Sequence, residues 1–376
     1  MNKIRGVIVY IGFGGIKTPA EAVKAELEKL GCEIVLVDIA KKLGSWFVDS
    51  LMEKGWRLSL KVPFLIECSN ALSNNPYISK MMYLHTFRFK KKIMEYLNQE
   101  KFDFVLSTHF MVTDILSDLR KAGKIKTPVF GYNADIISSH AIWISKNVDL
   151  YFAPTKDAYE GMIKKGMSKD KMVECSFPIN EKYINRIKGN VYKKVGLKKK
   201  FTVIFTIGGE GFDIRKYVAP IAKRYPAIQI VVICGRNKKI IEMMNKLSEK
   251  YSNIIVKGFV DNMHEYYRAS DLAVIKAGFN TIFECIFMKK PFIIIKAMGN
   301  EVIAANYVRQ NELGWWTKTQ KGFLQLFNSI IKDKKQLYLA KKRIEKQNFE
   351  PGAPKIAKCI MEYVNKIKKE QPTDSA

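Results

Sequence analysis

A short apolar run, a glycine-rich turn and a helical segment follow one another repeatedly along this chain. Residues 7–11 lead into the glycines of 12–15 and then into TPAEAVKAELEKLG, whose apolar residues have helical spacing. The same order recurs at residues 201–207, where the glycines of 208–211 and another helix follow. Alternation of apolar strands with helices is typical of the doubly wound α/β arrangement. We therefore expect two α/β domains with parallel sheets.

Composition limits the class of protein and of partner. The 376 residues suffice for two domains, and a hydrophobic fraction of 47% excludes a disordered chain. The formal net charge of +28 indicates an anionic partner. The basic residues are spread and form no nucleic-acid-binding motif, so an anionic membrane surface is the better candidate. Six scattered cysteines without a C-x-x-C pair favour a reducing cytoplasm over a disulfide framework.

The chain shows no sign of crossing a membrane. No run approaches the roughly 18 apolar residues that a spanning helix needs. The basic start and apolar core of residues 1–15 are similar to a signal peptide, but the apolar run is short and ends in glycines. We interpret it as a first buried strand that enters a turn.

The stretch from Asp271 to Glu284 has the features of an anion site. An apolar run at 272–275 is followed by a break at Gly278 and by a helix that opens at Asn280 and Thr281. Free backbone N–H groups and the helix dipole at such a start both favour phosphate. Glu284, in the first turn of the expected helix, can accept hydrogen bonds from ribose hydroxyls. For this stretch alone, a plain strand–turn–helix with Glu284 as a partner of the helix dipole is the favoured explanation.

Extended to residue 314, this stretch resembles the nucleotide-sugar site of GT-B glycosyltransferases. The resemblance is to the group of monogalactosyldiacylglycerol synthase and processive diacylglycerol glucosyltransferase, which is similar to glycosyltransferase family 28. It is carried by DLAVIKAGFNTIFECIFMKKPFIII, then by Gly299, Asn300, Glu301 and Asn306. The family pattern is D-x-x-I-x-K-x-G-x-x-T-x-x-E followed by G-Q-E-x-x-N, so Asn300 stands where the family has glutamine. The resemblance implies two Rossmann-like domains that face a cleft.

The same resemblance implies the roles of the donor-binding residues. Glu284 is expected to bind the ribose, the glycine turns to surround the uridine diphosphate, and Asn300 with Glu301 to hold the donor sugar. The shorter reach of Asn300 can change which hexose fits. The glycines at 208–211 suit backbone contact with a pyrophosphate, although they also suit a tight turn. The expected donor-binding residues are Gly208, Gly209, Arg236, Phe259, Val260, Lys276, Gly278, Phe279, Asn280, Thr281, Glu284, Gly299, Asn300, Glu301 and Asn306.

The first glycine loop departs from the family pattern. In the resembled family this loop carries a histidine near the acceptor, which is thought to help catalysis. Here Gly14 and Gly15 match, but Ile16 occupies the position of the histidine. Because isoleucine cannot accept a proton, another residue must act as the general base. This departure also leaves open a protein that binds a UDP-sugar without catalysis.

Three other residues of the first half are candidates for catalysis. Residues 133–143, NADIISSHAIW, match the family's T-D-F-x-x-H-x-x-W at Asp135, His140 and Trp143. An aspartate and a histidine just past a strand end can form an acid–base pair, or the histidine can brace the loop. His109 follows the strand expected at 102–107, at the end where ligands of such sheets bind. We expect Asp135 and His140 to be catalytic, and His109 is the third candidate.

Two segments mix aromatic, apolar and basic residues. Residues 43–61 suit a membrane interface and, about equally, an amphipathic core helix. Residues 83–92, YLHTFRFKKK, can hold anionic lipid at about 1 kcal/mol per charge, or form a solvated helix face. The expected membrane contacts are Trp46, Phe47, Trp56, Arg57, Arg88, Lys90, Lys91 and Lys92. These residues predict a cytoplasmic protein attached peripherally to the inner face of the cell membrane.

These observations combine into one prediction of organisation and function. We expect an acceptor and membrane-side domain at 1–189, a linker at 190–200, a UDP-sugar domain at 201–348, a helix at 349–369 that returns to the first domain, and a disordered tail at 370–376. The predicted reaction transfers glucose or galactose from a UDP-sugar to a membrane lipid, diacylglycerol, without a further cofactor or metal. The alternatives are a polyprenyl-diphosphate acceptor, a UDP-sugar-binding protein without catalysis, and a soluble UDP-sugar epimerase or hydrolase.

Overall fold

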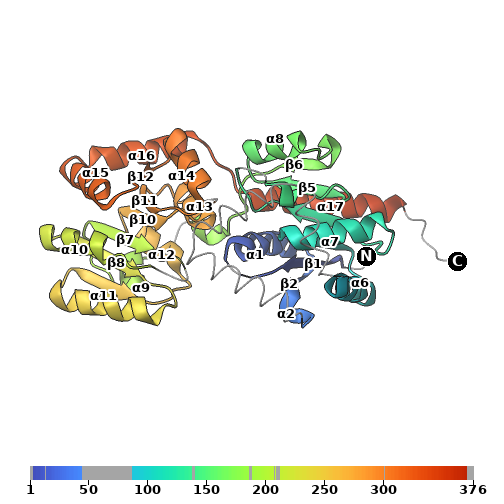
Figure 1. Cartoon of the computed structure of the whole chain (residues 1–376), viewed down its shortest axis with the longest axis horizontal. Coiled ribbons are helices and arrows are strands. Elements are labelled where there is room, and N and C mark those ends of the chain that lie inside the picture. Colours follow the sequence, from blue (N-terminus) through green and yellow to red (C-terminus); the bar gives the residue numbers. More distant parts are fainter. Residues whose placement is uncertain are drawn as a thin grey trace. The chain divides into compact units, whose positions relative to one another are not determined.

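The chain folds into two α/β units (Figure 1). The computed structural model describes residues 3–12, 14–44, 87–137, 140–185, 189–206, 208, 212–299 and 301–370. Unit 1 comprises Met1–Asn180 with Glu350–Ala376, and unit 2 comprises Glu181–Phe349. The aromatic segment that contains Trp46, Phe47, Trp56 and Arg57 lies outside the described residues, as do the last six residues of the chain.

Unit 1 is built on a six-stranded sheet in which every described pairing is parallel. Its strand order is β2-β1-β3-β4-β5-β6. The strands are β1 (Arg5–Tyr10), β2 (Glu33–Asp38), β3 (Phe104–Ser107), β4 (Val129–Tyr132), β5 (Leu150–Ala153) and β6 (Met172–Glu174). Val7 of β1 lies opposite Val35 and Val105 in the neighbouring strands. The strands are apolar on both faces because helices cover both sides of a parallel sheet.

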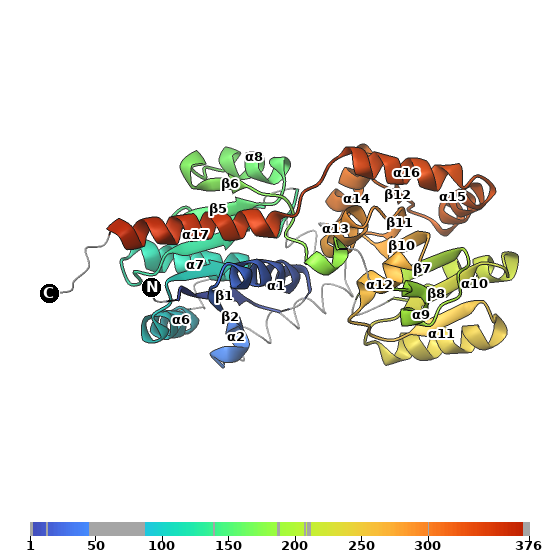
Figure 2. The ribbon, with the colours of Figure 1, turned by 180° about the vertical axis from the view of Figure 1, so that it is seen from behind.

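Two helix layers cover this sheet. Helices α1 (Gly14–Lys29) and α17 (Gly352–Glu370) pack on one face, as Figure 2 shows from behind. Helices α6 (Phe87–Glu100), α7 (Phe110–Lys121) and α8 (Lys156–Lys164) contribute apolar residues to the core on the other face. A short helix, α2 (Ile39–Lys42), follows the edge strand β2.

The last helix is a structural part of unit 1. The Tyr363 hydroxyl on α17 donates a 2.7 Å hydrogen bond to Asp149, whose carboxylate also accepts bonds from the Arg120 side chain and the Val129 N–H. At the start of α17, the N–H of Gly352 donates to the carbonyl of Phe177 at 3.0 Å. The chain thus leaves unit 1, forms unit 2 and returns to complete the first core.

Unit 2 repeats the architecture. Its parallel sheet has the order β12-β11-β10-β7-β8-β9. The strands are β7 (Thr202–Thr206), β8 (Gln229–Ile233), β9 (Ile254–Lys257), β10 (Leu272–Lys276), β11 (Phe292–Lys296) and β12 (Trp315–Trp316). The helices are α9 (Val191–Val195), α10 (Arg215–Arg224), α11 (Lys238–Lys250), α12 (Met263–Arg268), α13 (Phe279–Phe287), α14 (Glu301–Gln310), α15 (Gln320–Lys332) and α16 (Lys335–Lys346).

Some boundaries differ from those expected from the sequence. The segment expected as a linker, 190–200, contains α9, because the Asn190 side chain accepts hydrogen bonds from the N–H groups of Tyr192 and Lys193 and caps a short helix. The two units divide at Asn180, nine residues before the expected boundary. Helix α1 begins at Gly14, so Gly15 and Ile16 lie in its first turn rather than in a loop before it.

The docking of α17 gives a test of this architecture. A β-carbon on residue 352 would overlap the carbonyl oxygen of Ser176, which is backbone and cannot move away freely. We expect Gly352→Ala to lower the free energy of unfolding by about 1–3 kcal/mol, measured by urea unfolding followed by circular dichroism.

The matched control for this prediction is Gly322→Ala in the first turn of α15. There the added β-carbon would meet only the Thr319 hydroxyl, at 3.2 Å, and alanine favours a helix over glycine by about 1 kcal/mol. Equal stabilities of Gly352→Ala and the wild type would contradict the docking of α17 described above.

Candidate functional site

The strand order of unit 2 defines where a ligand binds to its sheet. From β7 the chain proceeds through β8 to β9 on one side, whereas β10, β11 and β12 lie on the other. The switch point therefore lies between β7 and β10, and ligands of such sheets bind outside the carboxyl ends of the strands at that point. Gly208 follows β7 with a φ of 74°, a left-handed conformation that favours glycine. The neighbouring Gly209 is outside the described residues.

Helix α13 begins at this switch point. Gly278 is its N-cap residue and has an extended backbone. Phe279, Asn280 and Thr281 form the first turn, and no acidic residue lies in that turn. The backbone N–H groups of a first helical turn have no partner within the helix, and the dipole adds positive potential there. The expected residues Phe279, Asn280 and Thr281 therefore form a helix start whose backbone groups and dipole favour an anion.

Glu284 lies in the second turn of α13, not in the first as expected from the sequence. The helix begins at Phe279 because Gly278 takes the N-cap position, so Glu284 is its sixth residue. Burial raises the pKa of the Glu284 carboxyl to about 7, while a hydrogen bond from the Tyr183 hydroxyl and the charge of Lys182 lower it. Near neutral pH this carboxyl can therefore exist in either form, and its ionised form accepts hydrogen bonds from hydroxyl groups.

Glu301 is held in place from both of its oxygens. At the start of α14, its Oε1 lies 2.6 Å from Lys276 Nζ, and its Oε2 accepts the N–H of Met298 at 3.1 Å. Burial raises the pKa of Glu301, and the charge of Lys276 opposes that rise. Gly299 has a φ of 56°, which lets the chain turn into α14, while Asn300 lies outside the described residues. Asn306 lies on α14, five residues after Glu301.

An exposed aromatic ring lies farther along the same edge of the sheet. Arg236 follows β8, and its guanidinium lies 3.7 Å from the centroid of the Phe259 ring, which follows β9. Phe259 is 56% exposed, and the adjacent Val260 is half-buried. A ring that is held by a cation and open to solvent is suited to stacking with a planar base.

In unit 1 the switch point lies between β1 and β3. Ile16, in the first turn of α1 after β1, accepts a 3.1 Å hydrogen bond from the Thr108 hydroxyl through its carbonyl. His109 follows Thr108 and is the N-cap residue of α7, without a side-chain capping bond. The His109 ring is buried and stacks on Phe110 with a centroid distance of 4.4 Å. The hydrogen bond between Thr108 and Ile16 thus joins the segments that follow β3 and β1.

The surroundings of His109 do not suit a general base. Burial lowers the pKa of His109 to about 3, so its ring is neutral at physiological pH. Its Nδ1 atom has no hydrogen-bond partner among the described residues. Efficient general bases have pKa values near the operating pH. His109 is therefore better suited to form a neutral, apolar part of the site than to transfer a proton.

Asp135 and His140 lie together in the loop after β4. Asp135 is buried; its N–H donates to the Asn133 side chain at 2.8 Å, and its Oδ2 accepts the backbone N–H of His140 at 3.0 Å. The His140 Nδ1 accepts the N–H of Ile142 at 3.3 Å, which places the proton of the neutral ring on Nε2. In this tautomer the Nε2–H group of His140 donates a hydrogen bond and cannot accept a proton, which favours Asp135 as the base.

Phe110 connects these candidates, and it was not among the residues predicted from the sequence. Phe110 stacks on His109 and also meets the Trp143 ring edge-on, with a centroid distance of 5.5 Å. The loop that carries Asp135 and His140 is thereby fixed to the start of α7. Phe110 has no distinctive signal in the sequence, because one aromatic residue at a helix start is common in any core.

The basic residues expected at a membrane lie on α6. Lys90 pairs with Asp118 at 2.8 Å, Lys91 lies 3.8 Å from Glu95, and Lys92 donates to the carbonyl of Leu43 at 2.8 Å. Arg88 is exposed, and so is the neighbouring Phe87, of which 74% is accessible to solvent. Helix α6 therefore presents a basic outer face while its inner face joins the core.

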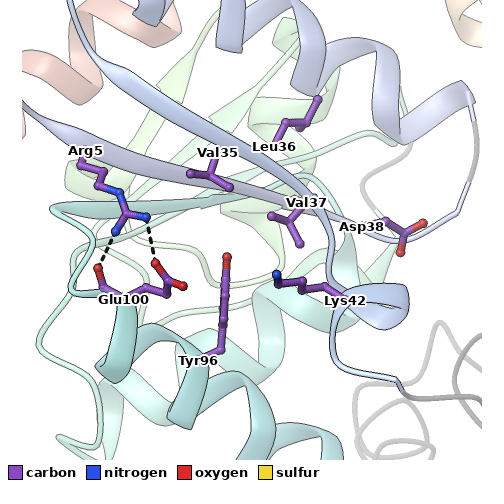
Figure 3. Close-up of a pocket in the computed structure, with 8 residues that line it drawn as sticks. All are labelled: Arg5, Val35, Leu36, Val37, Asp38, Lys42, Tyr96 and Glu100. Carbon is purple, nitrogen blue, oxygen red and sulfur yellow. Dashed lines mark hydrogen bonds and ion pairs between the residues drawn. The ribbon is translucent and has the colours of Figure 1, made fainter.

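A separate pocket of about 390 Å³ lies beside the edge strand β2 (Figure 3). Figure 3 shows the Tyr96 side chain directed at β2, and a hydrogen-bonded Arg5–Glu100 pair at one end. The lining contains none of the expected site residues; it consists of Arg5, Val35, Leu36, Val37, Asp38, Lys42, Tyr96 and Glu100.

Two known protein families match this chain, one in each unit. Residues 17–179 match the family described as monogalactosyldiacylglycerol (MGDG) synthase, and residues 202–314 match the glycosyltransferase family 28 C-terminal domain. The first match falls in unit 1 and the second in unit 2. The resemblance to the group of monogalactosyldiacylglycerol synthase and processive diacylglycerol glucosyltransferase is therefore confirmed.

Individual proteins are similar in sequence or in fold. The processive diacylglycerol beta-glucosyltransferase of Staphylococcus carnosus is 27% identical over 253 residues, which make up 65% of this chain and 63% of that relative, less than two thirds of its length. The crystal structure of MurG from Acinetobacter baumannii has a TM-score of 0.63 at 13% identity, covering 96% of this chain and 99% of that one. UDP-GlcNAc 2-epimerase from Neisseria meningitidis, bound to UDP-GlcNAc, has a TM-score of 0.61 at 17% identity, covering 97% and 100%. The expected GT-B fold is confirmed.

The environment of Glu284 predicts a pH dependence of stability. Its pKa of about 7 in the folded protein exceeds its ordinary value of 4.5, so the folded state loses stability as the pH rises through this range. Glu284→Gln removes that loss. We expect the variant to gain about 1–3 kcal/mol over the wild type in urea unfolding at pH 8, and much less at pH 5.

The control for this prediction is Glu345→Gln in the same unit. Glu345 is half-buried, and a hydrogen bond from Lys342 lowers the pKa of its carboxyl, so its replacement is expected to change stability little and in the opposite direction. A Glu284→Gln variant whose stability relative to the wild type is the same at both pH values would show that Glu284 is not held in this environment.

Proposed function

We propose that this chain transfers a hexose from a UDP-sugar to a hydroxyl group of a membrane lipid, with diacylglycerol as the acceptor. The observation that carries the proposal is the pair of family matches, which follow the order of the two units. The site gives chemical support, because an anion-binding helix start and the Lys276–Glu301 pair lie at the carboxyl edge of the unit 2 sheet. The relative in Staphylococcus carnosus is a processive diacylglycerol beta-glucosyltransferase.

In the proposed donor complex, the start of α13 binds the diphosphate of the UDP-sugar. Glu284 accepts hydrogen bonds from the ribose hydroxyls in its ionised form, and the uracil stacks at Phe259. Glu301, fixed by Lys276, accepts hydrogen bonds from the donor sugar through the lone pairs that its present partners leave free. Helix dipole and basic side chains then neutralise the leaving diphosphate, so the proposed reaction needs no bound metal or other cofactor.

In the proposed transfer step, the hydroxyl oxygen of the lipid attacks the anomeric carbon of the donor sugar. The bond from that carbon to the phosphate oxygen breaks, and its electron pair stays on UDP. The hydroxyl proton moves to the Asp135 carboxylate, which the N–H of His140 orients at 3.0 Å. This assignment supplies a base although Ile16 occupies the position of the family's histidine.

We further propose that the protein acts at the anionic inner face of the cell membrane. The net charge of +28 and the exposed Phe87 and Arg88 of α6 support such a surface association. Across the part of the chain that the structure describes, no helix combines the length and apolar character that a membrane crossing requires. Binding to this surface would then be peripheral.

Two other functions make different predictions. Ile16 favours a protein that binds UDP-sugars without catalysis, and the likeness in fold to a UDP-GlcNAc 2-epimerase favours a soluble epimerase or hydrolase. The first predicts tight UDP binding and no turnover, and the second predicts turnover without a lipid. A polyprenyl-diphosphate acceptor is the second candidate within the transferase class.

The function is tested by measuring UDP release from a panel of UDP-hexoses. Each donor is assayed with and without diacylglycerol in anionic vesicles, at low and high salt. We expect release that needs both diacylglycerol and the vesicle surface and that falls as salt rises, because salt screens attraction between exposed charges. Release without any lipid would favour the epimerase or hydrolase, and release with a polyprenyl diphosphate alone would change the acceptor.

The role of Asp135 is tested by Asp135→Asn, which keeps an acceptor for the His140 N–H but cannot take a proton. We expect kcat to fall by about 10²–10⁴-fold while the Kd for UDP stays the same. Asp170→Asn, on an exposed turn of the same unit, is expected to retain full activity. Retention of kcat by Asp135→Asn would exclude Asp135 as the general base.

A further inference from the structure

Two lysines end adjacent strands next to the switch point of unit 2. Lys276 is the last residue of β10 and Lys296 the last residue of β11, and they lie opposite each other in the register of the two strands. Their partners differ. Lys276 Nζ forms the 2.6 Å ion pair with Glu301, whereas Lys296 Nζ lies 4.4 Å from the centroid of the Phe212 ring.

The partner of Lys296 shows where its charge lies. Phe212 belongs to the connection between β7 and α10, and β7 is the strand on the far side of β10. The ammonium group of Lys296 therefore extends from β11, past the end of β10, to the connection that follows β7. The ends of β10 and β7 form the switch point of the sheet, and α13 begins after β10. Lys296 thus directs a positive charge to the place that the sheet topology assigns to a ligand.

The neighbouring charges balance the positive charge of Lys296 only in part. Burial lowers the pKa of Lys296, and the positive charges of Lys276 and Lys216 lower it further. Glu301 is the acidic group that opposes them, and it is already in contact with Lys276. An aromatic ring attracts a cation less strongly than a charged hydrogen-bond acceptor does. Negatively charged oxygens of a ligand would attract the Lys296 ammonium group more strongly than the Phe212 ring does.

We infer that Lys296 binds the diphosphate of the nucleotide-sugar donor, together with the start of α13. This inference rests on the proposed function and adds a residue that the sequence pattern did not indicate. The aliphatic stem of Lys296 crosses the strand end, and its ammonium group moves from the Phe212 ring to a phosphate oxygen when the donor binds. When the sugar leaves, the same group faces the negative charge that stays on UDP.

The test compares binding of UDP and of uridine, measured by isothermal titration calorimetry. Lys296→Met keeps an unbranched apolar stem and removes the charge. We expect its Kd for UDP to rise about tenfold to a hundredfold, because hydrogen bonds to charged groups contribute about 1.5–3 kcal/mol. Its Kd for uridine should stay within about twofold of the wild type, since uridine carries no phosphate. Lys296→Arg keeps the charge and is expected to restore most of the affinity for UDP.

A matched control lies at the opposite end of the same sheet. Lys334 Nζ lies 4.8 Å from the centroid of Phe201, which immediately precedes β7, so it makes the same type of contact far from the carboxyl ends of the strands. Lys334→Met is expected to leave the Kd values of both UDP and uridine unchanged. Comparison of the two lysine variants separates loss of a phosphate contact from loss of a lysine–phenylalanine contact.

The outcomes distinguish this inference from the proposed function. If Lys296→Met binds UDP as tightly as the wild type, the inference is wrong and the proposed function stands. If it loses UDP and uridine in equal proportion, Lys296 only supports the Phe212 connection, and the inference is wrong as well. If the wild-type protein itself binds no UDP, the proposed function fails, and the inference fails with it.

Discussion

The parallel pairing of β7 with β10 is the interaction on which the candidate site depends. Leu272 to Ile275 of β10 lie in register with Val203 to Thr206 of β7, and all of these residues are buried. Because the strands are parallel, their carboxyl ends reach the same edge of the sheet. Because the chain order reverses at this pair, the connections leave in opposite directions, and ligands of such sheets bind at this point. Loss of this register would separate the glycine after β7 from the start of α13.

Polar and charged groups are concentrated where the apolar strands end, and desolvation sets their properties there. Glu284, Glu301 and Lys296 all have pKa values shifted toward their neutral forms by burial. The Lys276–Glu301 pair offsets part of this cost with a direct ion pair. Shifted ionisable groups that cluster at a strand edge are typical of functional sites, although ion pairs that serve structure alone also produce them. The proposal for Lys296 therefore depends on the position of its ammonium group and not on its pKa.

The sequence predicted the two sheets well, because short apolar runs between glycine turns and helices have few other ways to fold. It was less accurate about helix starts. Asn280 and Thr281 are good capping residues, so the helix was expected to open there. The extended backbone of Gly278 takes the cap position instead, which moves Glu284 into the second turn. In the same way, α1 includes Gly14 and Gly15 although glycine is a poor helix former.

Contacts between elements that lie far apart in sequence were beyond prediction from residue patterns. The stack of Phe110 with His109 and Trp143 depends on how α7 and the loop after β4 approach each other. The contact of Lys296 with Phe212 spans an entire strand of the sheet, and no local pattern marks either residue. By contrast, the sequence indicated that a helix starts near Glu301, but the pairing of its two oxygens with Lys276 and the Met298 N–H appears only in the structure.

The two units differ in charge at their carboxyl edges, and this difference bears on which substrate each can bind. In unit 2, Lys276 is paired with Glu301, so Lys296 and the start of α13 supply the positive potential that favours an anion. In unit 1, burial keeps the ring of His109 neutral, and the buried Asp135 carboxylate would oppose the binding of an anion. A nucleoside diphosphate therefore suits unit 2, whereas an uncharged hydroxyl that must give up a proton suits unit 1.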